Sequence, residues 1–296
     1  MDAVDDLADV FRRVVRDDDP PVDVQERAHV APEELAGLLR GYDFVLDDHT
    51  QMPTAAMREC RDIKHIIFLG TGARSYMNPE ELADIGKTVH IIKGYGDTAV
   101  AEHTIALMWG AARGIARMDR DMRRGVWTRT EGPQLTGKTL GLIGYGGIGA
   151  EVARIAHGSG MRVLAWNRSA KSARGVTFVD LDTLLQESHV VSLHLLLDDE
   201  TRGFLNAERI ARMRPGAIFV NTARGALLDE AALIAGLREG RIAHAALDVF
   251  HQEPLPVDHA FTRWENVTLS AHSAFRTPEA SEALLRRALD IARRLA

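Results

Sequence analysis

The stretch KTLGLIGYGGIGAEVARIAHG, residues 138–158, decides the fold. A short apolar run leads into a glycine pattern of the form G-x-G-x-x-G, and helical periodicity follows it. In this context the first glycine permits a tight turn, the second lets the backbone approach a pyrophosphate, and the third lets helix and strand pack closely. The amides at the start of the helix attract the phosphate charge. The predicted phosphate-binding residues are Gly144, Gly146, Gly147, Ile148 and Gly149.

Short apolar runs alternate with helical patterns on both sides of this stretch, as in a parallel α/β protein. The earlier runs are VDVQ, FVLDD, HIIFLG and VHII, and the later ones TLGLIGYG, RVLAWN, HVVSLHLLL, AIFVNTA, HAALDVF and VTLSAH. The later runs are continuously apolar, which indicates strands buried on both faces of a sheet. Residues 99–125 show unbroken helical periodicity, so we expect a domain boundary near residue 95.

The composition fits a globular protein of two domains and excludes several classes. Its 296 residues include 36 Lys and Arg against 42 Asp and Glu, a net charge of -6 that argues against nucleic acid as the main partner. No apolar run reaches the roughly 18 residues that cross a bilayer, and the acidic start does not resemble a signal peptide. The single cysteine, Cys60, suits a buried thiol in a reducing compartment. We therefore expect a cytoplasmic protein without a membrane or nucleic-acid partner, and find no pattern of metal ligands.

The two ends of the chain are predicted to be helical. Residues 1–21 form an amphipathic pattern that stops at three aspartates and two prolines. Residues 277–296 open with Thr277 as a cap and Pro278 in the first turn, and this helix could return to the first domain. The four tryptophans are expected to be packing residues: Trp109, Trp127, Trp166 and Trp264.

The strand after the glycine motif ends in an unusual way. An acidic residue normally stands at this point and accepts hydrogen bonds from the adenosine ribose. Here Asn167 stands there, followed by Arg168 and Ser169. An amide does not repel a ribose 2′-phosphate, the arginine can pair with it and the serine can donate to it, which predicts NADPH as the cofactor. In the alternative, Arg168 is a solvated residue and both NADP and NAD are used.

Three later runs deliver charged residues to the carboxyl edge of the predicted sheet, where parallel α/β sheets bind ligands. They present Arg224, then Asp248 and Glu253, then His272. An arginine can hold a carboxylate, a histidine can give a proton, and a carboxylate can orient the imidazole and favour its charged form. The set suits reduction of a keto acid. Each residue could equally be a loop, turn or cap residue, and spacing alone leaves both interpretations open.

The chain resembles the D-isomer-specific 2-hydroxyacid dehydrogenases over nearly its whole length. The segments that carry the resemblance are VAEHTIALM, GKTLGLIGYGGIG, residues 200–242, ALDVFHQEPLP and NVTLSAH. The resemblance implies a Rossmann-type doubly wound domain, residues 96–275, inserted into a smaller flavodoxin-like α/β substrate domain, residues 1–95 plus 276–296. It also implies a homodimer formed largely through the cofactor domains and an active site in the interdomain cleft.

The resemblance also implies a role for each matching residue. Arg224 would hold the 2-oxo acid, His272 would donate the proton, and Glu253 would orient the imidazole. The residues implied to contact the nicotinamide are Thr222, Ala223 and Asp248, and those implied to meet the substrate carboxylate are Thr71 and Gly72. We expect an NADPH-preferring reductase of the glyoxylate or hydroxypyruvate type. The alternative is a dinucleotide-sensing, corepressor-like interaction protein without significant turnover.

Some positions depart from the family pattern. Ile91 and Lys93 replace a common Asn and Pro, and Leu196 replaces a common Pro. Phe275 and Arg276 stand where many relatives have Gly and Ser. A bulky ring and a cation next to His272 would change which substrates fit.

Overall fold

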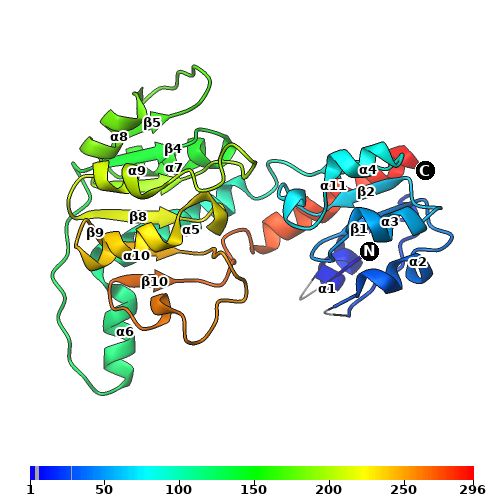
Figure 1. The fold of residues 1–296 in the computed structure, drawn as a ribbon, viewed down its shortest axis with the longest axis horizontal. Helices are drawn as coiled ribbons and strands as arrows, with labels where there is room; N and C mark the ends of the chain where they lie inside the picture. Colours follow the sequence, from blue (N-terminus) through cyan, green and yellow to red (C-terminus); the bar gives the residue numbers. More distant parts are fainter. Residues whose placement is uncertain (4–6, 28) are drawn as a thin grey trace. The chain divides into compact units, whose positions relative to one another are not determined.

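The computed structural model describes residues 1–3, 7–27 and 29–296, and the chain forms two compact units (Figure 1). The smaller unit comprises Met1–Gly96 and Arg276–Ala296, and the larger unit comprises Asp97–Phe275. Each unit has its own parallel sheet. Among the described residues, no helix combines the length and apolar character needed to cross a membrane.

The larger unit contains a seven-stranded sheet in the order β10-β9-β8-β7-β4-β5-β6, in which every pair is parallel. Numbered within the unit this order is 7-6-5-4-1-2-3, so the predicted Rossmann-type sheet is confirmed. The order reverses at β4, which lies between β5 and β7. The strands are β4 (Thr139–Ile143), β5 (Arg162–Trp166), β6 (Val176–Phe178), β7 (Val190–Leu193), β8 (Ala217–Asn221), β9 (Ile242–Leu247) and β10 (Val267–Leu269).

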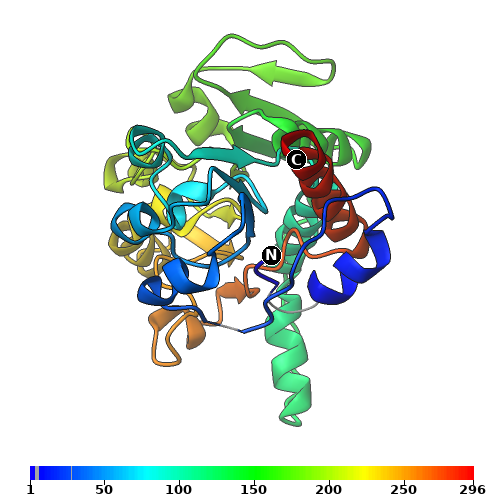
Figure 2. The same ribbon diagram turned by 90° about the vertical axis from the view of Figure 1, so that its right-hand side faces the viewer.

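Alternate residues of these strands enter two separate cores, one on each face of the sheet. In β8, Ile218 and Val220 join the core that helices α5 and α7 cover, while Phe219 joins the opposite core beneath α8, α9 and α10 (Figures 1 and 2). Burial on both faces explains why these strands are continuously apolar in sequence. The helices of this unit are α5 (Asp97–Arg113), α6 (Ile115–Arg123), α7 (Gly147–Gly158), α8 (Leu181–Glu187), α9 (Ala207–Arg212) and α10 (Glu230–Arg238), with 3-10 turns η3 (Gly225–Leu227) and η4 (Ala260–Thr262).

Two details of the larger unit correct the sequence predictions. The helical pattern over residues 99–125 is broken at Gly114, whose φ of 61° lies in the left-handed region. A Cβ at this glycine would lie 3.0 Å from Oγ1 of Thr130, which itself donates to the Arg113 carbonyl. Strand β6 was not predicted, because two half-buried residues on either side of an exposed threonine form no apolar run.

The smaller unit has three parallel strands in the order β1-β2-β3, namely β1 (Phe44–Asp47), β2 (His65–Phe68) and β3 (Thr88–Ile91). Two short extended segments continue the sheet beyond β1. The amide of Asp2 donates to the Leu46 carbonyl at 2.9 Å, and Asp2 forms a parallel bridge with Gln25. In chain order the sequence of segments is therefore 2-1-3-4-5, which confirms the flavodoxin-like prediction.

The start of this unit also differs from the prediction of a helix from the first residues up to the aspartates at 17–19. The described helix is α1 (Leu7–Val14), and Asp2 belongs to the sheet. The predicted strand VDVQ is reduced to the bridge at Gln25. The other helices and 3-10 turns are η1 (Pro32–Glu34), α2 (Leu35–Leu38), α3 (Thr54–Glu59), η2 (Ala73–Ser75), α4 (Pro79–Asp84) and α11 (Pro278–Leu295).

Helix α11 packs against α1 in the smaller unit. It begins as predicted, because Oγ1 of Thr277 accepts from the amide of Ala280 at 3.2 Å. The side chain of Asp19 is fully buried and accepts from Arg286 at 2.5 and 2.7 Å and from Arg293 at 2.6 Å. The aspartate run therefore anchors the N-terminal segment to α11 as well as following α1.

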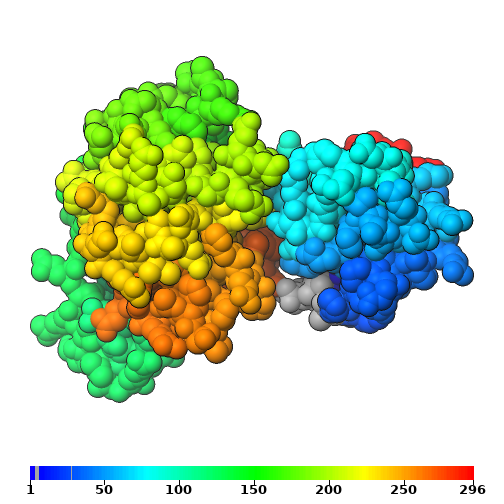
Figure 3. Space-filling view, in the orientation of Figure 1, coloured from blue at the N-terminus to red at the C-terminus, as the bar shows by residue number. Residues whose placement is uncertain are grey.

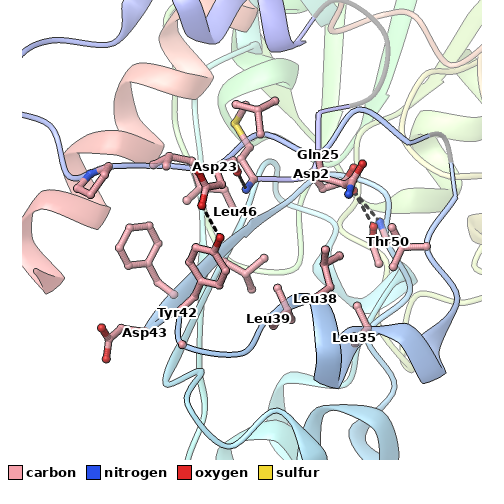
Figure 4. Close-up of a pocket in the computed structure, with 18 of the residues that line it drawn as sticks. Asp2, Asp23, Gln25, Leu35, Leu38, Leu39, Tyr42, Asp43, Leu46 and Thr50 are labelled. Carbon is pink, nitrogen blue, oxygen red and sulfur yellow. Dashed lines mark hydrogen bonds between the residues drawn. The ribbon is translucent and has the colours of Figure 1, made fainter.

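The smaller unit also contains a largely apolar cavity of about 480 Å³ next to β1 and α2 (Figure 4). Its polar lining groups are paired with one another: the Tyr42 hydroxyl donates to Asp23, and Oγ1 of Thr50 donates to Asp2 at 2.9 Å. Cys60 is buried in the core of this unit, as expected.

Candidate active site

The glycine motif forms the turn between β4 and α7, and the surroundings exclude a side chain at Gly144 and Gly149 but leave open space at Gly146. Gly144 has φ of 100°, and a Cβ there would lie 2.5 Å from the His194 carbonyl oxygen. A Cβ at Gly149 would lie 2.6 Å from the Gly144 carbonyl oxygen. At Gly146, no atom of the described chain would lie within 4 Å of a Cβ. The space above Gly146 is open, so the backbone there can be approached closely by a phosphate group.

The start of α7 completes this site. Gly146 is the N-cap, so no side chain caps the helix at this position. Gly147 and Ile148 supply the first helical amides. A Cβ at Gly147 would lie 1.8 Å from Oδ2 of Asp97, so a larger residue there would have to displace that side chain. The first helical amides and the open space at Gly146 fit a pyrophosphate at the positive end of the helix dipole.

The strand end at β5 is tied to the glycine turn through Asn167. Its Oδ1 accepts from the Tyr145 amide at 3.1 Å, and its Nδ2 donates to the carbonyl and hydroxyl oxygens of Ser169 at 3.0 and 2.9 Å. An aspartate could accept the Tyr145 amide but could not donate to Ser169. The amide therefore organises both the glycine turn and the three-residue strand end.

Arg168 is the exposed member of this strand end. Its Nη1 lies 2.7 Å from Oε2 of Glu200, and both side chains are about three-quarters exposed, at 76% and 77%. This exposure is compatible with both interpretations of the sequence, so pairing of Arg168 with a ribose 2′-phosphate stays a prediction; the carboxylate partner was not revealed by the sequence.

The loop after β8 carries Thr222, Ala223 and Arg224, and Asn221 shapes it. Asn221 Oδ1 accepts from the Ala223 amide, and its Nδ2 donates to the Arg224 carbonyl, both at 3.0 Å. Thr222 is tied to α5 through a 2.8 Å hydroxyl contact with Thr104. Asn221 lies in the apolar run AIFVNTA but was not among the predicted site residues, because only the structure shows that it holds the loop.

His272 and Glu253 lie side by side although they follow different strands. Nδ1 of His272 is 2.6 Å from Oε2 of Glu253, and both side chains are about one-third exposed. Oε1 of Glu253 accepts from the Phe250 amide at 2.8 Å. Burial acts to raise the pKa of Glu253, but the hydrogen bond and charge of His272, the Phe250 amide and the charge of Arg224 lower it below its ordinary value. The Arg224 guanidinium itself donates to the Ala223 carbonyl at 2.7 Å, so the meeting of all three predicted catalytic side chains stays a prediction.

The His272 loop is folded around the carboxylate of Asp248. Oδ1 accepts from Oγ of Ser270 at 2.6 Å and from the Ser273 amide at 3.0 Å, and Oδ2 accepts from the Ala274 amide at 3.0 Å. The Asp248 carbonyl accepts the His272 amide at 2.7 Å. His272 itself has φ of 49°, the only positive φ of a non-glycine residue in the described chain.

The Asp248 carboxylate is completely buried. Burial acts to raise its pKa, but hydrogen bonds from His103, Ser270 and the loop amides lower it to about 2. Nε2 of His103 lies 2.9 Å from Oγ of Ser270. The predicted contact of Asp248 with the nicotinamide stays a prediction, whereas its role in holding the His272 loop is visible. His103 and Ser270 were missed because their partners are distant in sequence.

The remaining predicted residues divide between the two units. Phe275 lies against His272, with ring centroids 6.2 Å apart and the rings nearly perpendicular. Thr71 and Gly72 lie in the smaller unit, at the carboxyl end of β2, where Gly72 precedes η2. Leu196 is exposed on the loop after β7.

The chain is similar to proteins of known activity. A model of the D-isomer specific 2-hydroxyacid dehydrogenase NAD-binding domain matches residues 105–274. A glyoxylate reductase from Thermofilum pendens is 35% identical over 261 residues, which cover 84% of this chain and 77% of that protein. A hydroxypyruvate reductase from Thermotoga maritima is 36% identical over 259 residues, covering 85% and 84%. The structure of an acyclic imino acid reductase with NADPH and D-Arg matches with a TM-score of 0.82 and 27% identity, over 96% and 94% of the two chains.

Proposed function

The chain belongs to the D-isomer specific 2-hydroxyacid dehydrogenase family, and from this premise we propose that it reduces a 2-oxo acid to a D-2-hydroxy acid with a reduced nicotinamide dinucleotide. The observation that carries the proposal is the 2.6 Å contact between Nδ1 of His272 and Oε2 of Glu253. The charge of Arg224 also helps to lower the pKa of Glu253. A cation, an imidazole and an ionised carboxylate together provide the groups that carbonyl reduction needs.

The reaction divides among these residues. The bound cofactor supplies the hydride that reaches C2 of the substrate. His272 donates the proton to the carbonyl oxygen; because its Nδ1 faces Glu253, the proton leaves from Nε2. Arg224 stabilises the negative charge that develops on that oxygen, and Glu253 keeps the imidazole charged and oriented. Reduction consumes a proton, so it is favoured at mildly acidic pH and the reverse reaction at alkaline pH.

The larger unit serves as the dinucleotide-binding domain in this proposal. The turn from Gly144 to Gly149 would hold the pyrophosphate, and the backbone of Thr222 and Ala223 would contact the nicotinamide. The smaller unit is the substrate domain, and Thr71 and Gly72 offer amides to the substrate carboxylate. Support comes from the open space at Gly146 and the loop held by Asn221.

NADP is the preferred cofactor in this proposal, with NAD also accepted. The support is the exposed guanidinium of Arg168 at the end of β5 and the absence of a carboxylate at Asn167. A guanidinium forms strong, charge-assisted bonds with a phosphate. The structural relative that contains NADPH belongs to the same fold.

The active form in this proposal is a homodimer in which α6 contributes to the interface. Helix α6 extends away from the sheet of the larger unit (Figures 1 and 3). Four large apolar side chains on it and on the segment that follows are more than half exposed: Ile115, Met122, Val126 and Trp127. Trp127 differs from the expectation that the four tryptophans are packing residues, since 73% of its surface is exposed in the described chain. An exposed apolar group of this size is typical of a protein interface.

The decisive experiment is a panel of 2-oxo acids assayed with NADPH and with NADH. The panel includes glyoxylate, hydroxypyruvate and phenylpyruvate, and the expected result is turnover of at least one, faster with NADPH. His272→Asn should lose about 10²- to 10⁴-fold in kcat while NADPH affinity is retained. The proposal is wrong if no member of the panel is reduced, and cofactor-dependent capture of a protein partner without turnover would support the corepressor-like alternative.

A further inference from the structure

An acidic turn faces the cation at the end of β5. Arg168 follows β5, whereas Glu200 lies in the turn after β7, 32 residues further along the chain. The guanidinium of Arg168 donates to Glu200 at 2.7 Å. The charge of Arg168 also contributes to lowering the pKa of Asp198, although the hydrogen bond from Thr201 is the largest cause. The strand end therefore carries its own anionic partner.

This turn is held in a defined shape. Oδ1 of Asp198 accepts from the amides of Glu200 and Thr201 at 3.1 and 2.9 Å. The hydroxyl of Thr201 donates to the Leu196 carbonyl at 2.7 Å. These bonds hold the backbone at Glu200, so its carboxylate is presented to Arg168 by an organised turn.

We propose that Glu200 is a specificity-determining residue that holds Arg168 and thereby lowers the affinity for the 2′-phosphorylated cofactor. The inference rests on the proposed function, because it assumes that the adenosine ribose lies at the end of β5. Glu200 opposes the effect of Arg168, so the chain discriminates between NADP and NAD less strongly than it would with the arginine alone.

The argument follows from the charges. A ribose 2′-phosphate that binds Arg168 must displace Glu200 or share the guanidinium with it, and in both cases two anions compete for one cation. A ribose without this phosphate does not compete with Glu200 for the guanidinium, so the ion pair stays intact when NADH binds. Because the pair is exposed to solvent, its influence is modest, and we expect about a three- to tenfold effect on affinity.

The test measures dissociation constants of NADPH and NADH by the change in cofactor fluorescence on binding, without substrate. Glu200→Gln should bind NADPH about three- to tenfold more tightly and NADH within about twofold of the native value. The matched control is Glu187→Gln. Glu187 also forms an exposed ion pair, 2.5 Å from Arg162 at the opposite end of β5, and the substitution changes net charge by the same amount. It should alter neither constant.

A second background tests whether Glu200 acts through Arg168. Arg168→Ala should weaken NADPH binding about ten- to a hundredfold and leave NADH binding almost unchanged. In the Arg168→Ala background, adding Glu200→Gln should have no further effect on NADPH. The inference is overturned if Glu200→Gln leaves NADPH affinity unchanged, or if it tightens NADPH equally with and without Arg168, since the carboxylate would then act by direct repulsion.

The two proposals fail in different ways. If the native chain binds neither NADPH nor NADH, the proposed function itself is wrong. If both bind and Glu200→Gln behaves like Glu187→Gln, the dehydrogenase assignment stands and the role of Glu200 is refuted. The fragments 2′,5′-ADP and 5′-AMP, competed against bound NADH, should show the same difference, because they differ only at the 2′-phosphate.

Discussion

His272 and Glu253 meet at 2.6 Å although they follow different strands, and the histidine occupies a left-handed backbone conformation with φ of 49°. The conformation is sustained by the loop around Asp248, whose carboxylate and carbonyl together accept four hydrogen bonds from residues 270–274. Backbone strain of this kind persists where the surroundings over-determine it, as at catalytic sites. Two acidic residues therefore determine where the imidazole lies: Glu253 contacts the ring, and Asp248 holds the backbone of the loop that carries it.

Glu253→Gln should reduce kcat for 2-oxo acid reduction by about 10- to 100-fold. The pKa of Glu253 is lowered, so in the native protein its carboxylate is ionised at neutral pH and stabilises positive charge on the imidazole. Without that negative charge, proton transfer from the imidazole is less well supported, so the loss should appear in kcat more than in KM. Steady-state kinetics at pH 7 measure both constants. A loss confined to KM would show that the carboxylate does not act in the proton-transfer step.

Asp248→Asn should lower kcat by about a hundredfold, since it displaces His272, and leave the NADPH dissociation constant within about twofold. The two carboxylate oxygens of Asp248 accept the amides of Ser273 and Ala274 separately. In an asparagine, the NH₂ group would face one of these two amides, and two donors cannot pair. The control is Asp258→Asn, on an exposed loop of the same unit. A large loss of NADPH affinity would instead support direct contact of Asp248 with the nicotinamide carboxamide.

Met122→Glu combined with Trp127→Ala should convert the expected dimer into a monomer, because it places a charge and removes a ring within the exposed apolar surface of α6 and the segment after it. Size-exclusion chromatography with light scattering measures the mass. Val257→Glu is the matched control, since Val257 is also apolar and exposed but lies outside this surface. The interface lies elsewhere if the double variant keeps the native mass.

Asp19→Asn should destabilise the protein by about 1–3 kcal/mol at pH 7, because it removes charged hydrogen bonds to Arg286 and Arg293. Hydrogen bonding to Arg286 is the main reason that the pKa of Asp19 lies far below its ordinary range. A lowered pKa means that the contribution is complete above the unfolded pKa of about 3.9 and is lost as the pH falls below it. Thermal unfolding should therefore show a gap between variant and native protein at pH 7 that narrows below about pH 4.

Asp17→Asn is the control for this measurement. Asp17 belongs to the same aspartate run but is exposed, so its substitution should change the unfolding temperature little. Equal effects of both substitutions would mean that the run acts through net charge and not through the buried ion pairs.

Much of the fold followed from local patterns. The glycine motif between an apolar run and a helix predicted the turn from β4 to α7, because the tight turn and the close helix packing each exclude a side chain at a specific position. Continuous apolarity predicted strands such as β8, which is buried on both faces. The break at Gly114 and strand β6 were missed, because a single glycine is tolerated within a helical pattern and a three-residue strand is too short to show a period.

The sequence by itself determined the order of parallel strands and helices, the phosphate turn, and the types of charged side chain placed at the strand ends, since these depend on neighbouring residues. Only the tertiary structure decided which of those side chains are partners. Arg168 finds Glu200 and His272 finds Glu253 across gaps of 32 and 19 residues, and Asp248 is enclosed by the loop that carries the histidine. Such pairings depend on how loops from separate strands meet at one edge of the sheet. A local sequence pattern does not indicate which residues of distant loops come into contact.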